Sequence, residues 1–358
     1  FLEKDVAAHF TTQWRLPPFG FNLFHLGFDQ RVACFEHQSL TASGPNGWRQ
    51  TLRALHIKQN SATGYAAENI LRKQLHLAVW LAGFTGVLGR LIELNEGWLV
   101  WYRVGLTALA FWVWRLFLPK STPLHWKQIL PIMAVGVVAT LHWLTFYASI
   151  KYANVSIALV CFSSIGFFTA LFEPLLLRTR FRLVEVGIGL LTLFGIYLVF
   201  YFDVEYKTGM VLGMISALLG SLFPIWNRFF LQQVSTKTLL SWQQTGGFIF
   251  LSCLLPFYLP YSDQGTSIPS WTDWGWMLVL VGGCSVWAFQ LSAAALKQLS
   301  AFTVNLSYNL EPLYGIALAF LLFQEEHFLH SGFYLGALII LFSLLLHAWL
   351  QMRGMRKK

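Results

Sequence analysis

Between residues 74 and 351 the sequence alternates apolar runs of roughly 20 residues with short polar breaks. About 20 apolar residues is the length at which an α-helix crosses the hydrocarbon core of a bilayer. Lipid offers no hydrogen bonds, so a spanning segment must satisfy its own backbone, as a helix does. The pattern therefore predicts an all-α integral membrane protein.

We expect ten spanning helices, and an even number places both termini on the same side of the membrane. The range that begins at 237 is the least apolar of them, because it opens with Ser241, Gln243 and Gln244. The predicted ranges are 74–93, 98–118, 127–148, 153–177, 183–202, 208–229, 237–260, 272–295, 300–323 and 331–351.

The composition excludes the other broad classes. Of the 358 residues 56% are apolar and 17% aromatic, but only 11% are charged, whereas a soluble domain carries about 25% charged residues. The net charge of +9 does not indicate nucleic-acid binding, because Lys and Arg stand between apolar runs and do not gather with aromatics on one face. The four cysteines show no metal-ligand spacing, so we expect packing residues and no metal or cofactor.

Residues 1–73 differ from the rest because no apolar run there is long enough to span a bilayer. We predict a soluble or disordered segment without a signal peptide. The chain begins with Phe and its first methionine is Met133, as expected of a truncated start, a non-Met start codon or upstream sequence read as protein, so the segment need not belong to the native protein. The expected domains are this segment, a first five-helix repeat over 74–205, a second over 206–352 and a basic tail over 353–358.

Basic residues in the short connections predict the orientation, since Lys and Arg resist translocation. If the first span starts in the cytoplasm, the outer connections carry only Lys151 and Lys207. The inner side then carries Lys120, Lys127, Arg178, Arg180, Arg182, Arg228, Lys237, Lys297, Arg353, Arg356, Lys357 and Lys358. We therefore expect cytoplasmic termini, in a bacterial inner membrane.

An internal repeat relates the two halves of the membrane region. A shift of 147 positions lays residues 153–156 on 300–303, Ala170 on Ala317 and Gly189 on Gly336. A weaker match lays Trp101 on Trp242. Because each half would hold five helices, the halves would have opposite orientations, as in inverted-repeat transporters.

Several motifs in the second half resemble a known family. Leu310-Glu311-Pro312 with Ala317, and then Gln324-Glu325-Glu326, is similar to the second-repeat signature of the EamA-like branch of the drug/metabolite transporter superfamily. Trp101-Tyr102-Arg103 and the segment from Gly83 to Arg90 also resemble that family. The first half departs from the pattern, because Ile165 stands where Pro312 would map and Thr179-Arg180 replaces the acidic pair. The resemblance therefore does not imply a symmetric role for the two halves.

The resemblance covers residues 74 to 352 and implies efflux or exchange of small metabolites, often amino acids, by alternating access. We accordingly expect an exporter of a small polar solute in a lipid bilayer, with protons as a candidate coupling ion. No enzyme motif such as HExxH, GxSxG or a Walker loop occurs in the sequence, so we expect no enzyme.

Glu311 is the leading candidate for solute binding, because an ionisable group at membrane depth needs a partner or a watery cavity. We expect it near the middle of the span 300–323, beside Pro312, which would free a backbone carbonyl. It would serve either as a cation or proton site or as a buried acid hydrogen-bonded to a neighbouring helix. Tyr308 lies one turn earlier on the same face, and Asn305 precedes it.

Arg103 is the second candidate and has two interpretations. It could hold a solute carboxylate by a bidentate contact, or it could extend to the outer interface and pair with Glu93 or Glu96. Gln244, near the inner end of its span, suits ligand contact or helix–helix hydrogen bonding.

Four further residues complete the predicted site, each with packing as its alternative role. Trp143, Trp287 and Gln290 fall in stretches that would line a cavity between the repeats. Ser164 lies opposite Glu311-Pro312 in the repeat alignment.

Two other functions remain open from the sequence. An organophosphate or nucleotide-sugar exchanger would need more basic residues in the spans 272–295 and 300–323, where Lys297 at the rim is the only one. A non-transporting sensor or scaffold would bind solute without flux.

Overall fold

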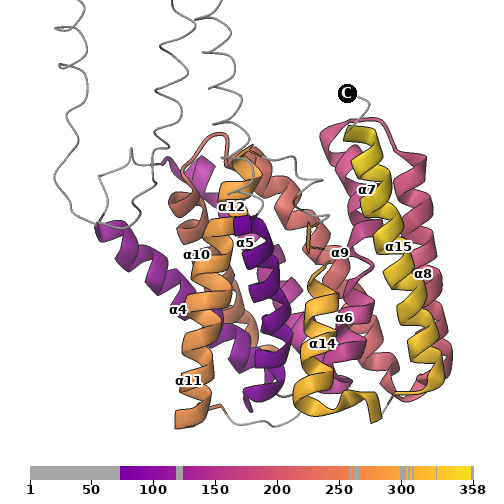
Figure 1. The fold of residues 1–358 in the computed structure, drawn as a ribbon. Helices are drawn as coiled ribbons and strands as arrows, with labels where there is room; N and C mark the ends of the chain where they lie inside the picture. Colours follow the sequence, from indigo (N-terminus) through magenta and orange to yellow (C-terminus); the bar gives the residue numbers. More distant parts are fainter. Residues whose placement is uncertain are drawn as a thin grey trace, which may run out of the picture. The chain divides into compact units, whose positions relative to one another are not determined.

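In the computed structural model, the structure describes residues 73–117, 124–258, 260, 267–298, 304, 307–308, 310–327 and 329–355. Every long element there is helical (Figure 1). A helix over residues 73–91 is followed by α4 (Glu96–Leu116), α5 (Trp126–Tyr152), α6 (Val155–Phe162), α7 (Ile165–Leu177), α8 (Leu183–Phe202), α9 (Lys207–Phe230), α10 (Thr236–Tyr258), α11 (Trp271–Val279), the π-helical segment η3 (Leu280–Trp287), α12 (Ala288–Gln298), α14 (Glu311–Phe323) and α15 (Ser331–Met355), with short 3₁₀ turns η1 (Val204–Tyr206) and η4 (Glu325–His327). Of the predicted segment 1–73, residues 1–72 lie outside the described residues, as does Asn305.

Within the described ranges, six spans are long and apolar enough to cross a membrane. They are Trp126–Tyr152, Val155–Leu177, Leu183–Phe202, Val204–Phe230, Trp271–Leu296 and Ser331–Leu350. The all-helical prediction is therefore confirmed for the part of the chain that the structure describes.

Two predicted spans are interrupted where the sequence suggested continuous helices. The span 153–177 consists of α6 and α7, which meet at Ser163 and Ser164. There the Ser163 hydroxyl donates to the Leu159 carbonyl (3.1 Å) and the Ser164 hydroxyl donates to the Cys161 carbonyl (2.7 Å). Such hydroxyl bonds compete with the helical ladder and bend it. The span 272–295 contains the π-helical segment η3.

The position of Glu311 also corrects a prediction. Glu311 is the first residue of α14 rather than a residue in the middle of a helix, and Pro312 lies in the first turn. Proline is tolerated there because the first N–H groups of a helix have no intrahelical acceptor. The carboxylate of Glu311 consequently lies at the positive end of the α14 dipole, which favours a negative charge.

Polar contacts link the loops between helices at each of the two ends of the bundle. At one of them Lys151 donates to the Ile92 carbonyl (2.6 Å), the Glu93 amide donates to Asp273 (2.9 Å), and Glu325 accepts from Ser156. We call this the Glu325 end. At the opposite end, Arg228 lies 3.8 Å from Glu173, and Lys237 lies over the Trp114 ring. We call this the Arg180 end, after the residue between α7 and α8. In Figure 1 the connection from α14 to α15 is at the bottom and the last turn of α15 is at the top.

Close helix crossings depend on glycine. α10 packs against both α4 and α5, and a Cβ on Gly136 of α5 would lie 1.8 Å from the Gln243 carbonyl oxygen of α10. A Cβ on Gly247 would meet the Thr140 hydroxyl at 2.0 Å. The polar start of α10 is thus a buried packing surface, which explains why its sequence is less apolar than that of a lipid-facing span.

We predict that Gly136→Ala lowers the free energy of unfolding by about 1–3 kcal/mol, because α5 and α10 must separate to admit the methyl group. The measurement is thermal unfolding in detergent micelles. Gly187→Ala in α8 is the matched control, since nothing lies within 4 Å of its added Cβ. Equal melting temperatures for the two variants would contradict the assigned packing.

A histidine–carboxylate pair fastens α15 to α8 at the Glu325 end. The buried Asp203 carboxylate accepts hydrogen bonds from the His330 Nδ1 (2.8 Å) and backbone amide (3.3 Å). The side-chain hydrogen bond to Asp203 and the charge of that carboxylate raise the pKa of His330 above its ordinary value. A raised pKa means that protonation of His330 stabilises the folded protein at low pH, and that this contribution is lost as the pH rises through the folded pKa.

His330→Asn should accordingly lower the melting temperature at about pH 5.5 and change it little above about pH 8. The effect is expected to be small because His330 is exposed. Melting curves of both proteins across this range test it, with His327→Asn as control, since His327 lies 3.8 Å from Glu326 and is also exposed. A deficit that does not vary with pH would refute the pairing.

Candidate functional site

One cavity of about 580 Å³ lies inside the bundle. Its walls come from the helix over residues 73–91 and from α4, α5, α6, α7, α8, α9, α10, η3, α12, α14 and α15. At its deep end are the buried side chains of Arg103 and Glu311, and it extends to the exposed residues Thr179, Arg180 and Arg182. The cavity is therefore deep and reaches the surface at the Arg180 end.

Arg103 of α4 is held by side chains from two other helical segments, η3 and α5. Its Nε donates to the Ser285 hydroxyl (3.0 Å) and its Nη1 donates to the Tyr147 hydroxyl (2.8 Å). The guanidinium also lies 4.7 Å from the centre of the Trp143 ring, a cation–π distance. With 2% exposure, Arg103 does not extend to the outer interface or pair with Glu93 or Glu96. That interpretation from the sequence was wrong, because hydroxyl and aromatic partners on α5 and η3 hold the guanidinium inside.

The π-helical segment η3 explains how Ser285 reaches this position. Its hydroxyl donates to the Leu280 carbonyl five residues earlier (3.0 Å) while accepting from Arg103. A π-helical turn pairs residues five apart and is common at functional sites. The Ser285 hydroxyl therefore has its donor and an acceptor lone pair both in use, and Arg103 keeps further N–H groups for another acceptor.

Among the described residues that line the cavity, Glu311 is the one acidic side chain at the deep end. It is 7% exposed, and within the described part of the chain no hydrogen bond or ion pair reaches its carboxylate. The helix over residues 73–91 comes close at this point, because a Cβ on Gly83 would lie 3.0 Å from the Glu311 carbonyl oxygen. A buried carboxylate without a protein partner beside a cavity is suited to bind a cationic group or a proton.

Five of the nine residues predicted from the sequence line this cavity: Arg103, Trp143, Gln244, Tyr308 and Glu311. The Tyr308 hydroxyl is hydrogen-bonded to the Ser292 hydroxyl. Gln244 is buried beside Gln243, which donates to the Asn227 side chain (3.2 Å).

Three predicted residues do not line the cavity. Trp287 is 53% exposed, as expected of a side chain on the outward face of η3. Ser164 is fully buried, with its hydroxyl bonded to the Cys161 carbonyl. The Gln290 amide nitrogen is buried without a hydrogen-bond partner among the described contacts. We therefore do not carry these three forward as binding residues.

Ser285 gains a place that sequence reasoning did not give it, while Tyr147 and His142 lie in the stretch around Trp143 that the sequence predicts to line a cavity. Ser285 and Tyr147 position Arg103, and the buried His142 lines the cavity, with its Nδ1 2.9 Å from the Ser216 carbonyl oxygen. Glu173 lies 3.8 Å from Arg228 at the Arg180 end. No sequence signal separates Ser285 from the other span serines, because its role depends on the π-helical turn.

Ser285→Ala should lower the free energy of unfolding by about 1–3 kcal/mol, because it leaves the buried Arg103 Nε without an acceptor. Melting temperature in detergent measures the change. Ser252→Ala is the control, since Ser252 also accepts a side-chain hydrogen bond, from Trp101, but is exposed. If both variants melt alike, Ser285 does not hold Arg103.

Comparison with known proteins gives two findings. A model of the EamA-like transporter family matches the chain twice, over residues 74–201 and 207–349. One solved crystal structure aligns at a TM-score of 0.53 and 16% sequence identity, covering 77% of this chain and 96% of that one. At this identity the alignment shows a shared fold and nothing about the solute.

Proposed function

The chain belongs to the EamA-like transporter family, and we propose that it is a secondary transporter that exports a small polar metabolite, an amino acid or related compound, by alternating access. Family membership makes it a membrane transport protein of the drug/metabolite superfamily. The solute class, the direction and the mechanism are the proposal.

The observation that carries the proposal is the pair Arg103 and Glu311 at the deep end of the cavity. Among the described residues they form no direct ion pair, and neither has another charged partner. Burying an ionisable group at membrane depth costs about 2.5–3.5 kcal/mol on insertion scales. A solute with a carboxylate for Arg103 and an ammonium group for Glu311 would compensate both charges.

The size and lining of the cavity support a small solute. Its volume of about 580 Å³ is in the usual range for small-molecule sites. Phe146, Phe162, Phe223 and Phe289 contribute apolar surface, while Gln244 and Tyr308 contribute polar groups. This combination suits an amphipathic metabolite.

We propose that the two matched segments are five-helix halves of opposite orientation. In support, α7 and α14 have equal lengths and each ends at a residue with φ of 53°, Arg178 and Gln324. The interruption of the spans before Ile165 and Glu311 suits a transporter in which discontinuous helices form the central site.

The orientation is inferred from the basic residues. With Arg180, Arg182 and Arg228 on the cytoplasmic side, both termini are cytoplasmic and the cavity opens inward. An inward-open cavity would load solute from the cytoplasm, as export from a bacterial cell requires. Protonation of Glu311 would compete with a cationic group and is the proposed route for proton coupling.

One observation favours an organophosphate exchanger as the second candidate. Arg180, Arg182 and Arg228 line the mouth of the cavity and could attract a phosphate group. In the described lining, however, Arg103 is the one basic residue at the deep end, which suits a single carboxylate better than a phosphate with two negative charges.

Flux into proteoliposomes tests the proposal with a panel of neutral amino acids, amines and phosphorylated sugars. We expect amino acids to be transported. Arg103→Gln should reduce their flux at least about tenfold by loss of charge-assisted hydrogen bonds. Glu311→Gln should remove the dependence of flux on pH. Trp287→Phe is the control outside the cavity and should transport normally. Unchanged flux and pH dependence in Glu311→Gln would make the acid structural, and binding without flux would indicate a sensor.

A further inference from the structure

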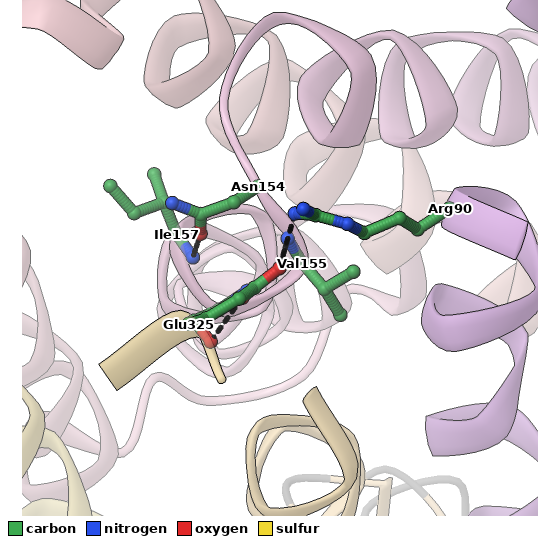
Figure 2. A network of polar contacts seen from close by, with 6 residues as sticks. Arg90, Asn154, Val155, Ile157 and Glu325 are labelled. Atoms are coloured by element: carbon green, nitrogen blue, oxygen red, sulfur yellow. Dashed lines mark hydrogen bonds and ion pairs between the residues drawn. The ribbon is translucent and has the colours of Figure 1, made fainter. Parts of the chain in front are cut away.

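Glu325 lies where the two matched segments meet, far along the chain from its partners. It follows α14 in η4 and is 1% exposed. One carboxylate oxygen accepts from the Arg90 guanidinium (2.8 Å) and the Val155 amide (3.1 Å). The other accepts from the Ser156 amide (2.8 Å) and hydroxyl (2.6 Å). Figure 2 shows this carboxylate between Arg90 and the start of α6.

These contacts complete the N-terminus of α6. The first N–H groups of a helix have no intrahelical acceptor. The Asn154 side chain accepts from the Ile157 amide (2.8 Å), and Glu325 accepts from the two preceding amides. A carboxylate at this position also interacts favourably with the helix dipole. The α6 terminus is therefore satisfied only while Glu325 stays in place.

The Glu325 end is closed by packing as well as by polar contacts. Val155 belongs to the same hydrophobic core cluster as the fully buried side chains Leu88, Ile92, Leu94, Leu99 and Tyr147. None of them lines the cavity. Opening the cavity toward this end would require α14 and η4 to move away from α6 and the helix over residues 73–91, which breaks the contacts of Glu325.

The opposite end lacks such a carboxylate. Arg178 ends α7 in the left-handed conformation, as Gln324 ends α14, so Thr179 follows α7 where Glu325 follows α14. Thr179 is exposed and lines the mouth of the cavity. The Arg228–Glu173 contact at that end is longer, at 3.8 Å, and both side chains are partly exposed. The Glu325 end is closed and the Arg180 end is open because a glutamate follows α14 where a threonine follows α7.

We propose that Glu325, with Arg90 and the Val155–Ser156 terminus of α6, is the latch that holds the outer side of the cavity closed. This inference rests on the proposed transport function. The latch must break once in each transport cycle, when the cavity opens away from the cytoplasm. The asymmetry between Glu325 and Thr179 then favours the inward-open state at rest.

Cys284 provides a native reporter, because it lines the cavity. Sealed membrane vesicles of either orientation are treated with a membrane-impermeant methanethiosulfonate, and modification of Cys284 in the full-length chain is quantified by peptide mass spectrometry. In the wild type we expect modification from the side of the C-terminal tail and little from the opposite side. Glu325→Gln retains the size of the side chain but loses the ion pair and one of its acceptor oxygens.

We expect Glu325→Gln to raise the rate of Cys284 modification from the side opposite the tail about tenfold, as the loss of charge-assisted bonds implies. Glu326→Gln is the matched control, because the adjacent Glu326 makes no contact with α6 among the described residues; it should leave the rate unchanged. Arg90→Gln removes one contact from a half-exposed side chain and should give a smaller increase, which tests the latch even if Glu325→Gln does not fold.

A folded Glu325→Gln protein with the wild-type rate from that side overturns the latch, as does an equal increase in Glu326→Gln. If the panel of solutes shows no flux but Glu325→Gln still exposes Cys284, the latch stands and the transport proposal fails. If solutes are transported but accessibility does not change in either latch variant, the transport proposal stands and the latch fails.

Discussion

The interior of this bundle is organised by the hydrogen bonds that hold one guanidinium at membrane depth. Arg103 is costly to bury, and Ser285, Tyr147 and the ring of Trp143 compensate that cost. These partners come from η3 and α5, so the placement of one cation ties together three helical segments. Because two of the partners are neutral hydroxyls, the positive charge itself is not neutralised and remains available to an anion from the cavity.

Glu311 is the buried acidic side chain in the same cavity as Arg103. It begins α14, where the helix dipole favours a carboxylate, and lies without a protein partner among the described contacts. The two charges share one cavity and do not pair directly, an arrangement that a folded protein rarely retains for stability alone. In a member of a transporter family, a solute with two charged groups is the simplest explanation for it.

The two ends of the bundle differ by a small change in sequence. After two helices of equal length that end alike, one half continues with Glu325 and the other with Thr179. The two charged oxygens of Glu325 accept from two helix amides, a hydroxyl and an arginine at once, whereas the single neutral hydroxyl of a threonine cannot accept four hydrogen bonds. The cavity reaches the surface at the threonine end. In the alternating access that we propose, such end contacts would form and break in turn, and their strengths would set the balance between states.

The sequence by itself determined the solvent and the class of the protein. Runs of apolar residues predicted helices in lipid, and the ranges 183–202 and 237–260 lie within two residues of α8 and α10, because hydrophobic length and polar breaks are local properties of a chain. The motifs around Arg103, Glu311 and Glu325 indicated the family that the comparison confirmed. Tertiary structure decided what local pattern cannot contain: that Arg103 turns inward to Ser285, that Glu311 begins a helix, that Trp287 faces outward, and that Glu325 reaches α6 across 169 positions of sequence. Each of these four placements depends on which helices pack together. Packing and the need to satisfy buried polar groups determine those helix contacts, and neighbours along the chain do not.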